Sequence, residues 1–250
     1  MPTLAERRNT FRALHQTGCF AIPNPWDGGS AVRLAKLGFK ALASTSAGAA
    51  WALGKEDGAM TLDEVLAHLR FLVGVTDLPV NADFEAGFAD TAQSVGENVL
   101  ACIDAGVAGI SIEDKIGTAL LPIEAAAERV RAAADAIKRS GQDVVLVGRC
   151  EAYAMQPLDM DEVMARLHAY AAAGADVLYA PGLRRLEDIA RVVRETSLPV
   201  NANLTNTGLS VADCASVGVR RVSVGAALAK ATYAAFDQYA ALLAEQGRLP

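Results

Sequence analysis

The sequence predicts an α/β protein folded as one (β/α)8 TIM barrel domain over residues 1–250. Three observations favour this fold class. The length of 250 residues matches one such barrel. Eight short apolar runs alternate with longer segments of helical period, which is typical of repeated βα units around a parallel sheet. A glycine also recurs where a helix should turn back into a strand, at Gly38, Gly106, Gly174 and Gly218.

The order of the elements follows from these runs. We expect strands near residues 19–23, 40–44, 78–83, 108–113, 143–148, 176–179, 198–202 and 220–224. The helices between them carry apolar residues at intervals of three and four, as at Leu62, Val65 and Leu69, and a last helix is expected over residues 226–245. An open doubly wound sheet is the alternative, but no GxGxxG motif follows the first strand.

Composition excludes several classes of protein. Apolar residues make up 52% of the chain and charged residues 21%, so a compact core is expected rather than a disordered or fibrous chain. The net charge of -6, without clusters of Lys and Arg, argues against a nucleic-acid partner. No window has the length of a membrane span. The four scattered cysteines show no CxxC spacing, and we expect a cytoplasmic protein with reduced thiols.

Acidic residues follow two neighbouring strands at the end where barrels place their active sites. Asp83 and Glu85 are two residues apart, and on extended backbone their carboxylates would lie on the same side, near Glu113 at the end of the next strand. Carboxylates that close would repel one another, whereas a hard divalent cation relieves the repulsion and prefers oxygen ligands. The alternative is that these acids cap helices or pair with Arg and Lys. We expect a metal site.

Arg149 ends an apolar strand, and its guanidinium could bind a substrate carboxylate in bidentate fashion. Its alternative role is an ion pair with Glu151 or Glu113. After the second strand, the small residues 45–48 could present backbone N–H groups to a developing oxyanion, although such a turn is most often only a loop.

The positions of the histidines argue against hydrolysis by a nucleophile that a histidine activates. His15, His68 and His168 all fall within expected helices, away from the strand ends, so we interpret them as surface or packing residues. Cys150 lies near the expected site, where it fits a small buried residue. Hydrolysis through a Ser-His-Asp or Cys-His arrangement is therefore disfavoured.

Several separate segments resemble the isocitrate lyase and phosphoenolpyruvate mutase superfamily, in order and over most of the chain. The segments that carry the resemblance are residues 21–27, 45–48, 54–58, 61–64, 78–88, 105–115, 149–152, 170–176 and 199–203. They include the strand-end residues Asp83, Glu113 and Arg149.

The resemblance implies a barrel enzyme with bound Mg²⁺, for which Mn²⁺ is an alternative. Its implied ligands are Asp83, Glu85, Glu113 and Asp57, directly or through water. It further implies a small carboxylic acid substrate, a 2-oxo acid or its enolate, and a homodimer or homotetramer. The residues implied to bind substrate are Thr45, Ser46, Ala47, Arg149, Asn203 and Trp26, and those implied to act in catalysis are Arg149, Lys115 and Asp57.

The segment after Glu113 departs from the superfamily pattern. Lyases carry a Lys-(Lys/Arg)-Cys-Gly-His loop there, whereas here Lys115 is followed by Ile116 and no cysteine. The residues that remain suit stabilisation of a metal enolate while a bond to C3 breaks. We therefore expect a Mg²⁺-dependent carbon–carbon lyase or decarboxylase for a small 2-oxo or 2-hydroxy carboxylic acid. The alternatives are a phosphonopyruvate or phosphoenolpyruvate mutase, a phosphonopyruvate hydrolase, and a catalytically silent 2-oxo acid-binding protein.

Overall fold

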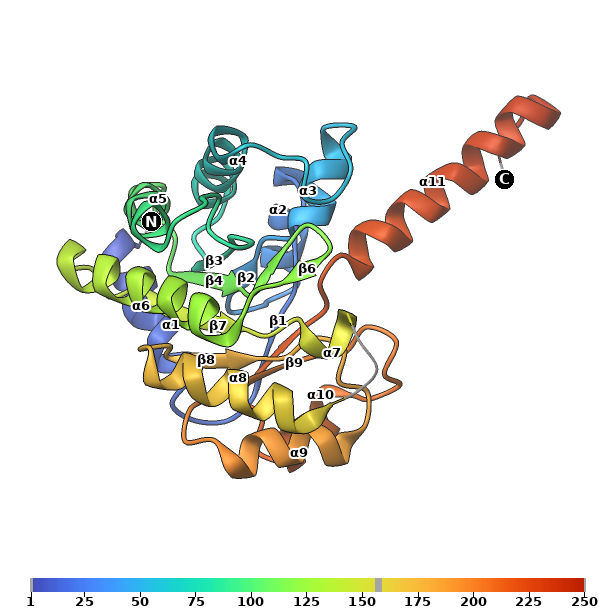
Figure 1. Ribbon diagram of the computed structural model, residues 1–250. Helices are drawn as coiled ribbons and strands as arrows, with labels where there is room; N and C mark the ends of the chain where they lie inside the picture. Colours follow the sequence, from blue (N-terminus) through green and yellow to red (C-terminus); the bar gives the residue numbers. More distant parts are fainter. Residues whose placement is uncertain (1, 156–158, 250) are drawn as a thin grey trace.

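The eight predicted strands are confirmed and form one parallel sheet (Figure 1). The computed structural model of the chain describes residues 2–155 and 159–249. The strands of this sheet are β1 (Phe20–Ile22), β2 (Leu42–Ala43), β3 (Val80–Asp83), β4 (Gly109–Glu113), β7 (Val145–Arg149), β8 (Val177–Tyr179), β9 (Val200–Asn203) and β10 (Arg221–Ser223).

The sheet curls into a nearly closed barrel, in which neighbours are hydrogen-bonded in the order β1, β10, β9, β8, β7, β4, β3, β2. The two end strands, β1 and β2, are joined by one hydrogen bond from the Ala43 amide to the Pro23 carbonyl, at 3.1 Å. Every strand is parallel to its neighbours, so all carboxyl ends open on the same side of the barrel. The predicted fold class is confirmed.

Helices surround the sheet between the strands. They are α1 (Leu4–Leu14), α2 (Gly28–Lys36), α3 (Ser46–Ala52), α4 (Leu62–Val75), α5 (Ala92–Asp104), α6 (Ile123–Ser140), α7 (Ala152–Met155), α8 (Met160–Ala172), α9 (Leu186–Glu195), α10 (Val211–Ser216) and α11 (Ala227–Gln246). Among the described residues, no helix combines the length and the apolar character needed to cross a membrane.

The recurring glycines end their helices as the sequence predicts. Gly38, Gly106, Gly174 and Gly218 lie two residues beyond α2, α5, α8 and α10, with φ between 87° and 104°. Only glycine adopts this left-handed backbone without a Cβ clash, so it lets the chain leave the helix and enter the next strand.

The apolar core has two layers. Side chains from the outer face of the sheet pack against the helices, whereas the inner layer fills the barrel with Val145, Val147 and Val177. Phe11 of α1 is fully buried in this inner layer. The lower part of the barrel is thus a packed core, which leaves the carboxyl ends of the strands to form a site.

Two features were not predicted. A short antiparallel hairpin, β5 (Lys115–Ile116) with β6 (Ala119–Leu120), follows β4, and Gly117 takes a left-handed φ of 58° in its turn. The last helix was predicted, but its direction was not: α11 projects away from the barrel, and Ala229 is its only buried residue (Figure 1).

Candidate active site at the carboxyl ends of the strands

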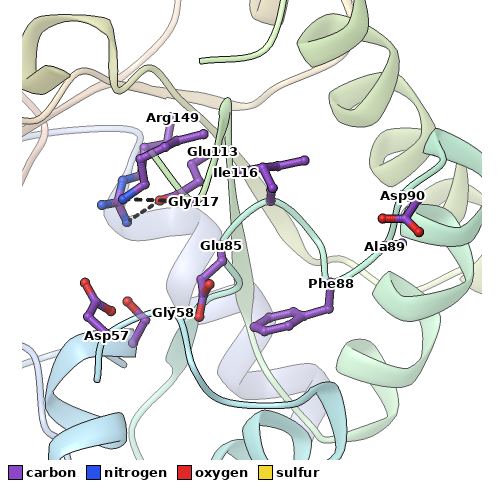
Figure 2. Close-up of a pocket in the computed structure, with 13 residues that line it drawn as sticks. Asp57, Gly58, Glu85, Phe88, Ala89, Asp90, Glu113, Ile116, Gly117 and Arg149 are labelled. Carbon is purple, nitrogen blue, oxygen red and sulfur yellow. Dashed lines mark ion pairs between the residues drawn. The ribbon is translucent and has the colours of Figure 1, made fainter. Parts of the chain in front are cut away.

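The predicted acids come from the ends of two strands and from one loop. Asp83 ends β3, Glu113 ends β4, and Asp57 lies in the loop after α3. Glu85, Glu113 and Asp57 line one cavity of about 420 Å³, together with Lys115. Figure 2 shows Glu113 beside Arg149, with Glu85 and Asp57 lower in the same view. The structure therefore brings the predicted acidic residues to one place.

Glu85 lines this cavity, but its backbone conformation differs from the expected one. We expected extended backbone from Asp83 to Glu85, but β3 ends at Asp83 and Glu85 has a φ of 44°. The intervening Phe84 is fully buried, and the Gly87 amide donates to the Phe84 carbonyl, so the chain turns here. Left-handed backbone at a residue other than glycine is strained, and such strain is typical of functional sites.

Arg149 lies at the centre of the acids. Its Nη1 is 3.0 Å from Oδ1 of Asp83 and 3.3 Å from Oε2 of Glu113, and its Nε contacts Glu151. Burial alone would favour the neutral guanidine, but the carboxylates of Glu151, Glu113 and Asp83 raise the pKa of Arg149 well above its usual value. The arginine thus stays charged and orders the strand ends β3, β4 and β7.

The pKa values of two acids are raised. Burial, then the charges of Asp83 and Asp57, raise the pKa of Glu85 to about 7. Burial, followed by the charges of Glu151 and Asp83, raises the pKa of Glu113 to about 8, even though Arg149 opposes this shift. Crowded carboxylates away from water favour the protonated form, unless a cation joins them.

The chemistry of the donors fits a hard divalent cation. The four acids offer only oxygen atoms, and Oε1 of Glu85 is buried without a hydrogen-bond partner among the described residues. As they stand, residues 2–155 and 159–249 contain no group of three or more His, Cys, Asp and Glu arranged to hold a metal ion. Asp83 and Glu113 instead contact Arg149.

A second cavity of about 220 Å³ lies deeper in the barrel and shares Arg149, Ser46 and Asp57 with the first. Three of the residues predicted to bind substrate line it with Arg149 and Ser46: Thr45, Ala47 and Asn203. Thr45 caps the N-terminus of α3, and the Ser46 amide donates to Oδ2 of Asp83 at 3.0 Å.

Trp26 lies apart from the two cavities, whereas Lys115 lies beside the acids. Trp26 lines neither cavity and faces a groove between α2 and α11, where Leu228 also lies. Lys115 begins the hairpin β5–β6, and its Nζ is 3.9 Å from Oε1 of Glu113. The structure thus brings Lys115 to the acids and places Trp26 apart from them.

Sequence reasoning missed several polar side chains inside the barrel. Tyr179 accepts a hydrogen bond from Nδ2 of Asn203 at 2.9 Å and lies 5.5 Å from the guanidinium of Arg149, measured to the ring centroid. Arg221 and Ser44 line the deeper cavity as well. The available signal was their position, since Tyr179 ends β8, Ser44 follows β2 and Arg221 begins β10.

Fold and site together define a barrel enzyme whose acids and arginine meet at the carboxyl ends of the strands. The profile of the phosphoenolpyruvate phosphomutase family matches residues 11–244, and the chain belongs to this family, within the phosphoenolpyruvate mutase/isocitrate lyase superfamily. Its named relatives include a 2-methylisocitrate lyase and a 2,3-dimethylmalate lyase.

The relatives differ in how much they share with this chain. The 2-methylisocitrate lyase of Escherichia coli (strain K12) is 33% identical over 184 residues, which cover 69% of this chain and 61% of that enzyme. The crystal structure of a Burkholderia cenocepacia J2315 protein, provisionally described as a lyase/mutase, has a TM-score of 0.95 and 44% identity, and covers 98% of this chain and 91% of that one. The structure of oxaloacetate acetylhydrolase with oxalate has a TM-score of 0.91 and 26% identity, and the match covers 100% of this chain and 90% of that one.

Proposed function

We propose that this chain is a Mg²⁺-dependent carbon–carbon lyase or decarboxylase that acts on a small 2-oxo or 2-hydroxy carboxylic acid. The observation that carries the proposal is the contact of Arg149 with both Asp83 and Glu113, at the mouth of a cavity that Glu85 and Asp57 also line. The names of two similar proteins, oxaloacetate acetylhydrolase and 2,3-dimethylmalate lyase, support the substrate class.

The side chains of this site suit the loss of a group from C3. Arg149 would bind and orient the substrate carboxylate through Nη2, because its Nη1 contacts Asp83 and Glu113 and its Nε contacts Glu151. In a 2-hydroxy acid, a base takes the hydroxyl proton, the C2–C3 bond breaks, its electron pair moves into the carboxylate on C3, and C2 becomes the carbonyl carbon of the 2-oxo acid that leaves. In a 2-oxo acid, the bond from C3 to the leaving carbon breaks, its electron pair moves to the 2-oxo oxygen as the enolate forms, and carbon dioxide or an aldehyde or ketone leaves. Held by Asp83, Glu85, Glu113 and Asp57, bound Mg²⁺ or Mn²⁺ would supply Lewis-acid stabilisation of the charge on that oxygen.

Decarboxylation makes the smallest demand on acid–base groups. Carbon dioxide leaves as a neutral molecule, and water can protonate the remaining enolate. A retro-aldol cleavage would also need a base for the substrate hydroxyl, for which Lys115 and Glu151 are the candidates near Arg149. Lys115 lines the cavity, with its Nζ 3.9 Å from Oε1 of Glu113.

One observation favours a second function, a phosphonopyruvate or phosphoenolpyruvate mutase or a phosphonopyruvate hydrolase. Lys115 lies beside the cavity at the start of the hairpin β5–β6, where a cation could bind a phosphoryl group. A catalytically silent 2-oxo acid-binding protein remains the proposal from another class.

A substrate panel separates these proposals. Purified protein is incubated with oxaloacetate, substituted malates, methylisocitrate or phosphonopyruvate, each with Mg²⁺ or with EDTA, against protein-free blanks. Release of pyruvate, glyoxylate or carbon dioxide from oxaloacetate, a malate or methylisocitrate supports the lyase or decarboxylase, whereas release of pyruvate with phosphate from phosphonopyruvate supports the hydrolase. Formation of phosphoenolpyruvate supports the mutase. Binding without any product supports the silent protein.

Two variants make this assay specific. Asp83→Ala removes a carboxylate that contacts Arg149 and should abolish turnover, whereas Asp63→Ala removes an exposed carboxylate of α4 that lines neither cavity and should leave turnover unchanged. Activity that persists in EDTA or in Asp83→Ala would contradict the metal-enolate mechanism.

We also propose that residues 1–250 form one domain, and that the protein is a cytoplasmic homodimer or homotetramer. Pairing of β1 with β10 ties the two ends of the barrel chain together. The exposed apolar side chains Phe236, Tyr239 and Leu243 of α11 support self-association. The four cysteines, all of them among the described residues, form no disulfide there, which fits a reducing compartment. Light scattering should give an oligomer mass that Phe236→Glu reduces.

A further inference from the structure

Arg221, the first residue of β10, is a charged side chain inside the barrel. It is only 2% exposed. On the side of α1, its Cζ lies 6.0 Å from the centroid of the Phe11 ring, and His15 lies nearby. Burial, and then the charge of Arg221, lower the pKa of His15 to about 3. This histidine is therefore neutral, and neither neighbour offers negative charge.

The hydrogen-bond partners of Arg221 are neutral as well. Its Nε donates to Oδ1 of Asn201 at 3.0 Å, and its Nη1 donates to Oδ1 of Asn81 at 3.2 Å. The two amides are held in this orientation because Nδ2 of Asn81 donates to Ser111 and Nδ2 of Asn201 donates to Ser223, each at 3.0 Å.

No carboxylate among the described residues forms an ion pair with Arg221. Burial lowers the pKa of Arg221 to about 10, a value that still leaves it charged at neutral pH. A buried charge without an opposite charge is costly. The barrel therefore holds a cation whose countercharge the described residues do not provide.

This cation lines the deeper cavity, on the same cavity wall as Ser223 and Tyr179. Two carboxylates, Asp83 and Asp57, also line this cavity, but neither forms an ion pair with Arg221. Asp83 is already engaged, since Oδ1 contacts Arg149 and Oδ2 accepts from the Ser46 amide. An anion that enters the cavity would thus meet Arg149 at the entrance it shares with the outer cavity, and Arg221 farther inside.

We propose that Arg221 makes this cavity a subsite for a second carboxylate, so that the site selects 2-oxo or 2-hydroxy dicarboxylates over the corresponding monocarboxylates. The inference rests on the proposed function, because it concerns the substrate class of the same site. Arg221 is then a specificity-determining residue, and the anion supplies the countercharge that Asn81 and Asn201 cannot.

Malate and lactate form a matched pair for the test, since both are 2-hydroxy acids and malate carries one more carboxylate. Binding is measured by calorimetry in the presence of Mg²⁺. A charge-assisted hydrogen bond should make malate bind wild-type protein about tenfold to hundredfold more tightly than lactate. Arg221→Met should weaken malate binding to the level of lactate and leave lactate binding unchanged within about twofold, and Arg221→Lys should retain part of the preference.

Two controls separate this inference from a purely structural role and from the proposed function. Unfolding curves and binding of Mg²⁺ alone show whether each variant is folded. A folded Arg221→Met that keeps the preference for malate overturns the inference. If Arg221→Met does not fold, the test uses the affinities of wild-type protein for malate and lactate. Equal affinities for the two acids would overturn the inference. Binding needs no turnover, so a preference for malate stands even if the substrate panel gives no product.

Discussion

A buried ion pair behind the site allows a quantitative prediction. The Asp114 side chain is 1% exposed, and its Oδ2 accepts from Nη1 of Arg166 at 3.0 Å and from the Tyr170 hydroxyl at 2.6 Å. Its Oδ1 accepts from the Glu151 amide at 2.7 Å. Arg166, which is 5% exposed, also donates to the Leu121 carbonyl at 2.9 Å. This pair connects the strand ends β4 and β7 to the hairpin β5–β6.

Replacing Arg166 with Met should destabilise the protein substantially. It leaves the Asp114 carboxylate buried without its cation, a change that typically costs about 3–5 kcal/mol. The hydrogen bonds from Tyr170 and Glu151 remain, which favours the lower end, about 3 kcal/mol. For a chain of this length, that corresponds to a fall in Tm of roughly 6–12 °C. Turnover should fall too, because Glu151 contacts Arg149.

Urea and thermal unfolding measure this effect. Arg191→Met is the matched control, because Arg191 forms ion pairs with Asp161 and Glu195 at the surface and should change the unfolding free energy far less than Arg166→Met does. The double variant with Asp114→Asn should lose less than the sum of the single variants, since the buried charge is gone. A loss of less than about 1 kcal/mol in Arg166→Met would refute the reasoning.

Three further predictions concern stability. Burial lowers the pKa of His15 to about 3 in the folded protein, so below pH 6.5 only the unfolded chain binds a proton at this residue. The unfolding free energy should therefore drop by about 2 kcal/mol between pH 6.5 and pH 5. Urea titrations should show that His15→Leu lacks this part of the loss. Gly109→Ala would place a Cβ 2.5 Å from Phe11 and 2.6 Å from Asn81, so it should cost about 1–3 kcal/mol in thermal unfolding. Gly74→Ala meets open space within α4, and the same melts should show a gain of up to about 1 kcal/mol. A Gly109→Ala variant that melts no lower than wild type, or a Gly74→Ala variant that melts lower, would contradict the corresponding prediction.

The sequence predicted the barrel because its signals are local. Strand runs such as residues 144–147 are apolar throughout, and the glycines after the helices mark the left-handed positions that the structure contains. The acids were placed by one rule, that parallel strands end on the same side of the sheet. That rule holds for Asp83, Glu113 and Arg149 whatever the packing between the strands.

What the sequence did not predict depends on contacts between distant residues. The turn at Glu85 follows from the burial of Phe84, which no local pattern shows. Trp26 follows β1 but faces α11, so proximity to a strand end did not place it in the cavity. Arg221 begins an apolar strand, and only the closed barrel shows that its partners are two amides rather than a carboxylate.

The binding of Mg²⁺ to the acidic cluster tests the central claim most directly. Thermal and urea unfolding of wild-type protein and of Asp83→Ala are compared with Mg²⁺ and with EDTA. At about one hundred times the dissociation constant, Mg²⁺ should stabilise the wild-type protein by about 2.7 kcal/mol and leave Asp83→Ala unchanged. Wild-type protein that Mg²⁺ does not stabilise, or an Asp83→Ala variant stabilised to the same extent, would contradict the account.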